Sequence, residues 1–119
     1  MSCAAALATI DLIEDGLIEN ADRMGEYLKK GLEGLRDRHS LIGDVRGLGL
    51  MLAIDLVKDR QTREPAPDAV EKILYKAFEK GLILLGCGAS SIRMATPLTV
   101  TEKEIDRGLG ILDEVLKSL

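Results

Sequence analysis

Apolar residues recur at intervals of three and four along the first third of the chain, which is the spacing of one face of an α-helix. The residues on this stripe are Leu7, Ile10, Ile13, Leu17, Ala21, Met24, Leu28, Leu32 and Leu35. They predict a first helix over residues 3–37. Gly16 interrupts the pattern, so we expect a kink or short break there, with Asn20 as an alternative N-cap for the second part.

The start of this helix has almost no polar face. Residues 4–13 consist mainly of alanine, leucine and isoleucine. A helix that is apolar on all sides has to be buried on all sides. A chain of 119 residues can cover only one side of it, so we expect structure outside this chain, or a second copy of it, to cover the rest.

An extended pattern replaces the helical one after residue 41. Residues 48–57 read as one long strand that begins at a pair of glycines. Residues 82–85 and 91–94 predict two shorter strands, which a glycine-rich turn at residues 86–89 joins. The polar segment between the first of these strands and the next helix is expected to be a surface connection.

End signals predict two further helices. The first opens at Pro67, because proline and the acid that follows it suit a first turn, and Gly81 ends it. Thr101 and Glu104 form a capping box that starts the last helix. The order helix, strand, helix, strand, strand, helix predicts one α+β domain over residues 1–119, a small sheet with helices packed on it.

Composition excludes several classes of partner. The net charge is −4, and Tyr27, Tyr75 and Phe78 are the only aromatic residues, so the positive surface and stacking platforms of nucleic-acid binders are missing. No apolar run approaches the roughly 18 residues of a membrane span, and we expect neither a membrane contact nor a signal peptide. Cys3 and Cys87 stand far apart, which favours free thiols and a cytoplasmic location.

Most candidate chemistry has a simpler structural explanation. Residues 47–49 lead into a strand and residues 86–88 lie between strands, whereas a phosphate-binding loop opens a helix. Cys87 has no base near it in the sequence, and His39, the only histidine, reads as a solvated residue at a helix end. With so few histidines and cysteines, we expect neither a metal site nor a catalytic triad.

The lysines indicate whether the chain can be an enzyme by itself. Covalent chemistry through lysine needs a desolvated amine presented by a strand or tight loop. Every lysine falls on a predicted helix or in the polar connection: Lys29, Lys30, Lys58, Lys72, Lys76, Lys80, Lys103 and Lys117. We therefore expect no catalytic residue within this chain.

Arg93 is the strongest candidate for binding a ligand. It lies between two apolar positions on a predicted strand, where a rigid backbone presents the guanidinium as a planar fork that matches a carboxylate. The alternative is an exposed arginine on an edge strand. Arg46 is similar, but an ion pair with Asp44 or Asp55 explains it adequately.

Five segments occur together in an order and spacing that identify a family. They are residues 3–8, 17–21, 43–51 (Gly-Asp-Val-Arg-Gly-Leu-Gly-Leu-Met), 81–88 and 92–98 (Ile-Arg-Met-Ala-Thr-Pro-Leu). Together they resemble the C-terminal part of class III aminotransferases over essentially the whole chain. The resemblance is strongest to 4-aminobutyrate aminotransferases, with acetylornithine and ornithine aminotransferases next.

The resemblance implies the small C-terminal domain of a fold type I enzyme that depends on pyridoxal phosphate, with a mostly antiparallel sheet. The cofactor's lysine, the acid facing its pyridine nitrogen and most phosphate contacts then belong to a large domain that this chain lacks. Arg93 falls on the family's arginine for the substrate carboxylate. The first helix would link to the large domain, and the expected assembly is a homodimer.

The whole protein is then expected to move an amino group from an ω-amino acid such as 4-aminobutyrate to a 2-oxo acid. Two positions depart from the family's common pattern: Ser90 or Ser91 replaces an asparagine, and Thr96 replaces the first proline of Pro-Pro-Leu. These departures affect the fine substrate specificity that the resemblance implies, and not the expected role of Arg93. A racemase or aminomutase on the same scaffold, and a non-catalytic interaction or dimerisation module, stay open as alternatives.

Overall fold

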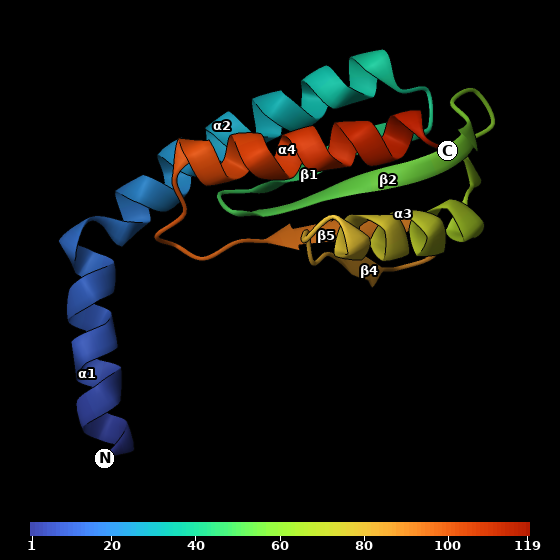
Figure 1. The fold of residues 1–119 in the computed structure, drawn as a ribbon. Coiled ribbons are helices and arrows are strands. Elements are labelled where there is room, and N and C mark those ends of the chain that lie inside the picture. Colours follow the sequence, from blue (N-terminus) through green and yellow to red (C-terminus); the bar gives the residue numbers. More distant parts are fainter.

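The computed structural model describes residues 1–119 as an antiparallel sheet with three helices on one face and a fourth leading away from it (Figure 1). The elements in order are α1 (Ser2–Leu12), the π-helical turn η1 (Ile13–Leu17), α2 (Ile18–Arg38), β1 (Ile42–Leu48), β2 (Met51–Asp59), β3 (Glu64–Pro65), α3 (Pro67–Glu79), β4 (Leu85–Cys87), β5 (Ser91–Ala95) and α4 (Glu102–Lys117). The predicted α+β class is confirmed. None of the helices combines the length and apolar character that crossing a bilayer requires.

The sheet has the strand order β1-β2-β5-β4, and every pairing in it is antiparallel. The short β3 pairs with the far end of β2. β5 therefore lies inside the sheet, between β2 and β4, although it comes late in the sequence. This arrangement places the residues of β5 beside those of the central hairpin.

Alternation along the inner strands decides which face the helices cover. On β2, Leu52, Ile54 and Leu56 are buried, and Leu52 and Ile54 pair with the buried Met94 and Ile92 of β5. These side chains meet apolar residues of α2, α3 and α4 in one continuous core. Residues at the alternate positions face the opposite way, and we call that uncovered side of the sheet the open face.

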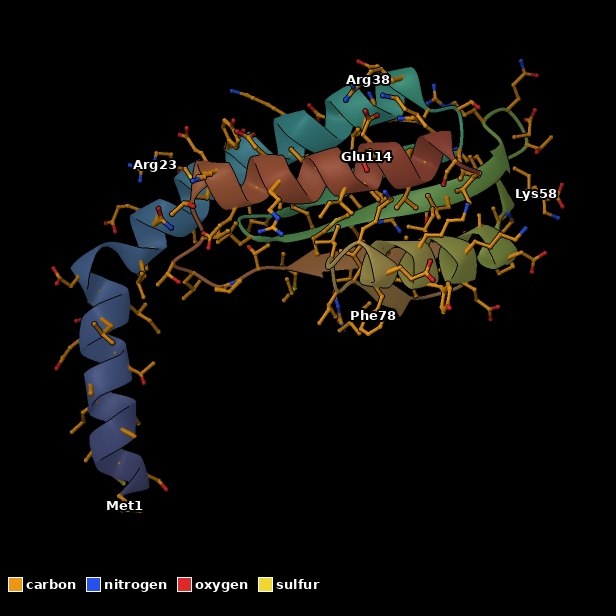
Figure 2. The ribbon with its side chains drawn as sticks, in the orientation of Figure 1. Met1, Arg23, Arg38, Lys58, Phe78 and Glu114 are labelled. Atoms are coloured by element: carbon orange, nitrogen blue, oxygen red, sulfur yellow. The ribbon has the colours of Figure 1, made fainter.

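α1 projects away from the body of the domain and buries none of its residues (Figure 1, Figure 2). The predicted break is confirmed: Gly16 has φ +101°, a conformation that suits glycine, and it separates α1 from α2. Leu7 and Leu12 are 64% and 62% exposed. The suggested cap at Asn20 is wrong, because Asn20 lies within α2 and its amide reaches other elements.

The expected single strand over residues 48–57 is wrong, because this stretch contains a hairpin. β1 and β2 are joined by a tight turn at Gly49 and Leu50, and Gly49 has a positive φ of +53°. Gly47 precedes the turn and packs so close to the backbone of Met51 that a side chain would not fit. The apolar run hides the turn, because Leu50 itself is buried.

Residues 82–85 do not form the expected strand. Only Leu85 belongs to β4, which begins later than expected and continues through Gly86 to Cys87. The other end signals are confirmed. Gly81 adopts φ +85° after α3, and Thr101 and Glu104 make both hydrogen bonds of the capping box at the start of α4.

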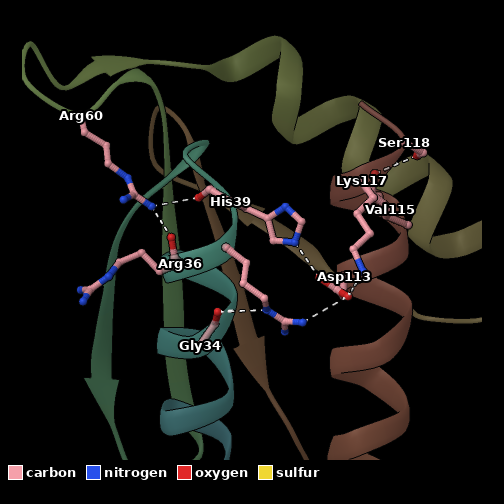
Figure 3. Close-up of polar contacts among 9 residues, drawn as sticks. Gly34, Arg36, His39, Arg60, Asp113, Val115, Lys117 and Ser118 are labelled. Carbon is pink, nitrogen blue, oxygen red and sulfur yellow. Dashed lines mark hydrogen bonds and ion pairs between the residues drawn. The ribbon is translucent and has the colours of Figure 1, made fainter.

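The expectation that His39 is a solvated helix-end residue is wrong. Its side chain is only 11% exposed, and Nε2 lies 2.6 Å from Oδ1 of Asp113 on α4 (Figure 3). Lys117 Nζ contacts the other oxygen of Asp113 at 2.7 Å, and Arg38 Nη1 lies 3.5 Å from it. Hydrogen bonds from His39 and then Lys117 lower the pKa of Asp113 to about 2. This cluster fastens the end of α2 to α4.

Arg60, in the turn that follows β2, forms hydrogen bonds with the same end of α2. Its guanidinium donates to the carbonyl oxygens of His39 at 2.9 Å and of Arg36 (Figure 3). It also donates to the carbonyl oxygen of Ile42 at 3.1 Å. Carbonyls at the last turn of a helix have no partner within the helix, so a cation there satisfies them. α2, β1 and the β2–β3 turn are thereby held together.

Replacing Gly25 with alanine should lower the free energy of unfolding by about 1–3 kcal/mol, because the added methyl would overlap the backbone of Gly49 at the hairpin turn. Gly34→Ala on the same helix is the matched control, since nothing lies within 4 Å of its added methyl. That change should stabilise the chain by about 0.5–1 kcal/mol through helix propensity. Urea unfolding of both variants measures the contrast, and equal effects would contradict the packing of α2 on this turn.

Replacing Asp113 with asparagine should cost about 1.5–3 kcal/mol of stability at pH 7, because charge-assisted hydrogen bonds are lost. The pKa of Asp113 is lower in the folded chain than its ordinary value of 3.8. Its contribution is therefore complete above about pH 4 and disappears as the pH falls through about 2. Urea unfolding of both proteins between pH 2 and pH 7 measures the difference. A difference that does not shrink in acid would contradict this role.

Candidate functional site

Arg93 lies on the open face, on an inner strand of the sheet. β5 pairs with β2 on one side and β4 on the other, and Arg93 stands opposite Ala53 and Leu85. Its neighbours along the strand, Ile92 and Met94, are buried on the helix side, so the arginine side chain points the other way. The edge-strand interpretation of Arg93 is therefore wrong.

One row of the open face carries two arginines with a small residue between them. Arg46 of β1 and Arg93 of β5 both pair with Ala53 of β2. Strands are spaced by about 4.8 Å, so the two arginine backbones lie roughly 10 Å apart. Apolar side chains border this row, and Met51 and Leu85 are 65% and 59% exposed.

Arg46 is neutralised by two acids. Its Nη1 lies 3.2 Å from Oδ2 of Asp44 and 3.4 Å from Oδ2 of Asp55. The expected ion pair is confirmed, and it involves both acids rather than one. Hydrogen bonding to Asp55, and then to Asp44, raises the pKa of the Arg46 guanidinium. From the other side, the hydroxyl of Ser91 donates to Oδ1 of Asp55.

Arg93, in contrast, forms no ion pair with any acid of the chain. Its side chain is exposed on the open face, among the apolar side chains of Met51, Ala95 and Leu85. The backbone of an inner strand is held on both sides, so the Cα of Arg93 is fixed. Its free guanidinium has two parallel N–H donors that no acid uses. This arrangement can receive one carboxylate in a bidentate geometry.

The segment after β5 is anchored to α2. Asn20 Nδ2 donates to the carbonyl oxygens of Leu98 at 2.6 Å and Val100 at 3.2 Å. Next to this segment lies a mainly aliphatic pocket of about 400 Å³ between α2, α4 and residues 82–85. Its lining includes Arg93 and Thr96, and the buried hydroxyl of Thr96 has no hydrogen-bond partner.

The other residues considered from the sequence do not gather at Arg93. His39 is engaged by Asp113, 74 positions along the chain. Cys87 ends β4, half-buried and free, and Cys3 is exposed on α1. No group of three or more histidine, cysteine or acidic side chains is arranged to hold a metal ion.

Comparisons with known proteins identify the family of the chain. The family model described as "Aminotransferase class-III" matches residues 1–116. The chain belongs to the class III aminotransferases.

Relatives in this family are much longer than the chain. The 5-aminovalerate aminotransferase DavT of Pseudomonas aeruginosa is 44% identical over 122 residues, which cover 100% of this chain and 29% of that protein. The leucine/methionine racemase of Thermococcus litoralis is 42% identical, covering 94% of the chain and 26% of the racemase. The chain therefore spans less than a third of the curated relatives that it matches.

Solved structures show the same fold at the same fraction of their length. A Bacillus anthracis aminotransferase superimposes with a TM-score of 0.94 and 34% identity, over 98% of this chain and 28% of that one. An amine transaminase from an uncultivated Pseudomonas species, in a PLP-bound form, gives a TM-score of 0.91 and 35% identity, over 98% and 27%. The fold of this chain therefore corresponds to just over a quarter of each of these two structures.

The lysines of this aminotransferase domain are not placed for covalent chemistry. None of them is buried: Lys58 lies on the exposed end of β2, Lys80 in the turn after α3, and the others on helices. The two that are half-buried are Lys29 and Lys76, and Lys76 donates to the carbonyl and hydroxyl of Ser118. No residue described here fits the attachment point of pyridoxal phosphate.

Two residues of the open face were missed as parts of a site. Asp55 was considered only as a partner for Arg46, and Ser91 only as a departure from the family's pattern. The structure brings them together with Arg46 across three strands. Period-two alternation along residues 51–57 was the available signal, because it places Asp55 on the same face as Ala53.

Proposed function

We propose that the whole protein carrying this domain is a pyridoxal-phosphate-dependent aminotransferase in which Arg93 binds the substrate carboxylate. The observation that carries this proposal is the free guanidinium of Arg93, the one arginine of the open face without an acidic partner. Membership of the class III family supports the reaction type. The substrates are an amino acid and a 2-oxo acid. Arg93 binds the carboxylate of the amino acid in one half of the reaction and that of the 2-oxo acid in the other half.

Pyridoxal phosphate, when bound, accepts electrons from the substrate's amine-bearing carbon and carries the amino group. The part played by this chain is binding and orientation. Arg93 fixes one end of the substrate by two parallel hydrogen bonds, so the amine at the other end is held in one position. Holding reactants in a defined geometry accounts for a large share of enzymatic rate enhancement. The inner-strand position of Arg93 keeps this anchor rigid.

An ω-amino acid such as 4-aminobutyrate is the proposed amino donor. Relatives named for 5-aminovalerate and 4-aminobutyrate are each 44% identical to the chain. Both named substrates are short chains with a carboxylate at one end and an amine at the other. One unpaired guanidinium bordered by apolar side chains suits that pattern, because the charge binds the carboxylate and the apolar surface accommodates methylene groups.

The 119-residue chain is proposed to be inactive by itself and to bind no pyridoxal phosphate, because none of its lysines is desolvated. In the whole protein, we expect the exposed side chains of α1 to be covered by the large domain. The assembled protein is proposed to be a cytoplasmic homodimer. The uncovered apolar surface of α1 and the absence of a disulfide are the features that support these statements.

A racemase is the second candidate. The relatives include a leucine/methionine racemase and an isoleucine 2-epimerase, which are 42% and 38% identical to the chain. Both activities need the same carboxylate anchor. They are distinguished by incubating the whole protein with one enantiomer of an amino acid and no 2-oxo acid: a racemase then forms the other enantiomer, whereas an aminotransferase does not turn over.

Arg93→Lys in the whole protein should lower kcat/KM for both substrates, because lysine cannot form the bidentate pair. The loss should correspond to about 2–5 kcal/mol of transition-state stabilisation if the rest of the protein buries the pair between Arg93 and the carboxylate. Arg107→Lys is the matched control, since Arg107 is an exposed arginine of α4 without an ion-pair partner. It should leave kcat/KM unchanged. Steady-state kinetics with both variants measure the contrast, and an unaffected Arg93→Lys enzyme would remove Arg93 from the site.

The 119-residue chain alone should self-associate through α1, because a helix exposed and apolar on all sides is unfavourable in water. Leu7→Glu combined with Ile10→Glu should return it to a monomer, since both side chains are exposed on α1. Light scattering over a concentration series measures the mass. A wild-type chain that stays monomeric at high concentration would contradict this expectation.

A further inference from the structure

Asp55 stands within reach of both arginines of the open face. Arg46 and Arg93 pair with the same residue, Ala53, from opposite sides of β2. Asp55 is two positions further along β2, so it is the diagonal neighbour of each arginine at the same register offset. Diagonal neighbours on one face of a sheet are about 7–8 Å apart, a distance that long side chains span.

Arg46 forms an ion pair with Asp55, whereas Arg93 does not. Arg46 Nη1 lies 3.4 Å from Oδ2 of Asp55, which shows that an arginine at this offset can reach it. On the other side Ser91, directly opposite Asp55 on β5, donates its hydroxyl to Oδ1. Each oxygen of the carboxylate therefore has a partner already, and Arg93 forms no ion pair with it.

A carboxylate without these two partners would attract the nearest unpaired cation. Asp55 is only 33% exposed, so water satisfies it incompletely. Arg93 is at the right offset and carries no other ion pair, and its flexible side chain could turn along the sheet to reach Asp55. An arginine held in this way would offer fewer donors to a ligand above the open face.

We propose that Arg46 and Ser91 are positioning residues that keep Asp55 occupied and so leave Arg93 free to receive a carboxylate. The freedom of Arg93 stands on the geometry alone, whereas its use for a substrate carboxylate rests on the proposed function. Arg46 is suited to this part because Asp44, two positions before it on β1, also contacts its Nη1, 3.2 Å away. Asp44 and Asp55 thus share one guanidinium, and the other remains uncommitted.

The rate at which phenylglyoxal, an arginine-specific dicarbonyl, modifies Arg93 measures this freedom in the 119-residue chain, with peptide mass mapping to resolve each arginine. Arg46→Met and, separately, Ser91→Ala should slow modification of Arg93 by about two- to fivefold, the factor that corresponds to an exposed ion pair. Arg107 serves as the internal reference, because its surroundings do not change. Circular dichroism checks that each variant is folded.

Two rescue variants make the test specific. Adding Asp55→Asn to Arg46→Met should restore the original rate at Arg93, because the competing charge is removed. Arg46→Lys should also keep the original rate, since a lysine still pairs with the acids. The proposal is overturned if Arg93 reacts at an unchanged rate in both folded single variants, or if the rate stays low after Asp55 is neutralised.

A second measurement separates this proposal from the proposed function. Sodium acetate should protect Arg93 of the wild-type chain from phenylglyoxal more than sodium chloride at the same ionic strength, and protection should be weaker in Arg46→Met. No protection of wild-type Arg93 would count against carboxylate binding while the rates above still test the part of Arg46 and Ser91. Equal protection in wild type and Arg46→Met would count against the positioning proposal alone.

Discussion

The two-residue alternation of the inner strands is the constraint on which the rest of the domain depends. Leu52, Ile54 and Leu56 are almost completely removed from water on the helix side of β2. Burying an aliphatic side chain stabilises a fold by about 1.5–3 kcal/mol, so together these three residues make any other register very unfavourable. Because successive residues of a strand point to opposite faces, Ala53 and Asp55 are forced outward, and the pairing with β5 forces Arg93 outward beside them.

The same constraint explains how a hydrophobic core can produce a polar site. The charged residues of the open face are not adjacent in the sequence, and none of them is held by a neighbour along the chain except Asp44 and Arg46. Their register follows from strands that pair to bury the opposite face. The backbone positions of Arg46, Asp55, Ser91 and Arg93 thus follow from core packing, and they are as rigid as the sheet itself.

Local signals in the sequence located the helices well. The capping box at Thr101, the glycine after α3 and the break at Gly16 all depend on backbone chemistry within a few residues, so they can be read directly. Alternation around Arg93 likewise showed which neighbours would be buried. Membership of the family was recognisable from short motifs, because their order and spacing span the whole chain.

Features that depend on distant contacts could not be read in this way. The β1–β2 turn lies inside a continuous apolar run and its Leu50 is buried, so no polar residue marks it. The extended residues 82–84 have no strand partner, because β4 pairs with β5 only from Leu85 onward. His39 and Asp113 are brought together by the packing of α2 against α4. Each of these outcomes depends on where other elements lie.

The break between α1 and α2 lies at Asp15 and Gly16, the two residues with non-helical torsions, so a change of torsion there turns the whole of α1. Eleven residues of helix extend about 16 Å, so a rotation of roughly 20° at this break moves the far tip by about 5–6 Å. Apart from the adjacent backbone, no group lies within 4 Å of the position that a side chain at Gly16 would occupy. Whatever holds the far end of α1 therefore sets the angle at which this domain, and the guanidinium of Arg93 with it, is presented to the rest of the protein.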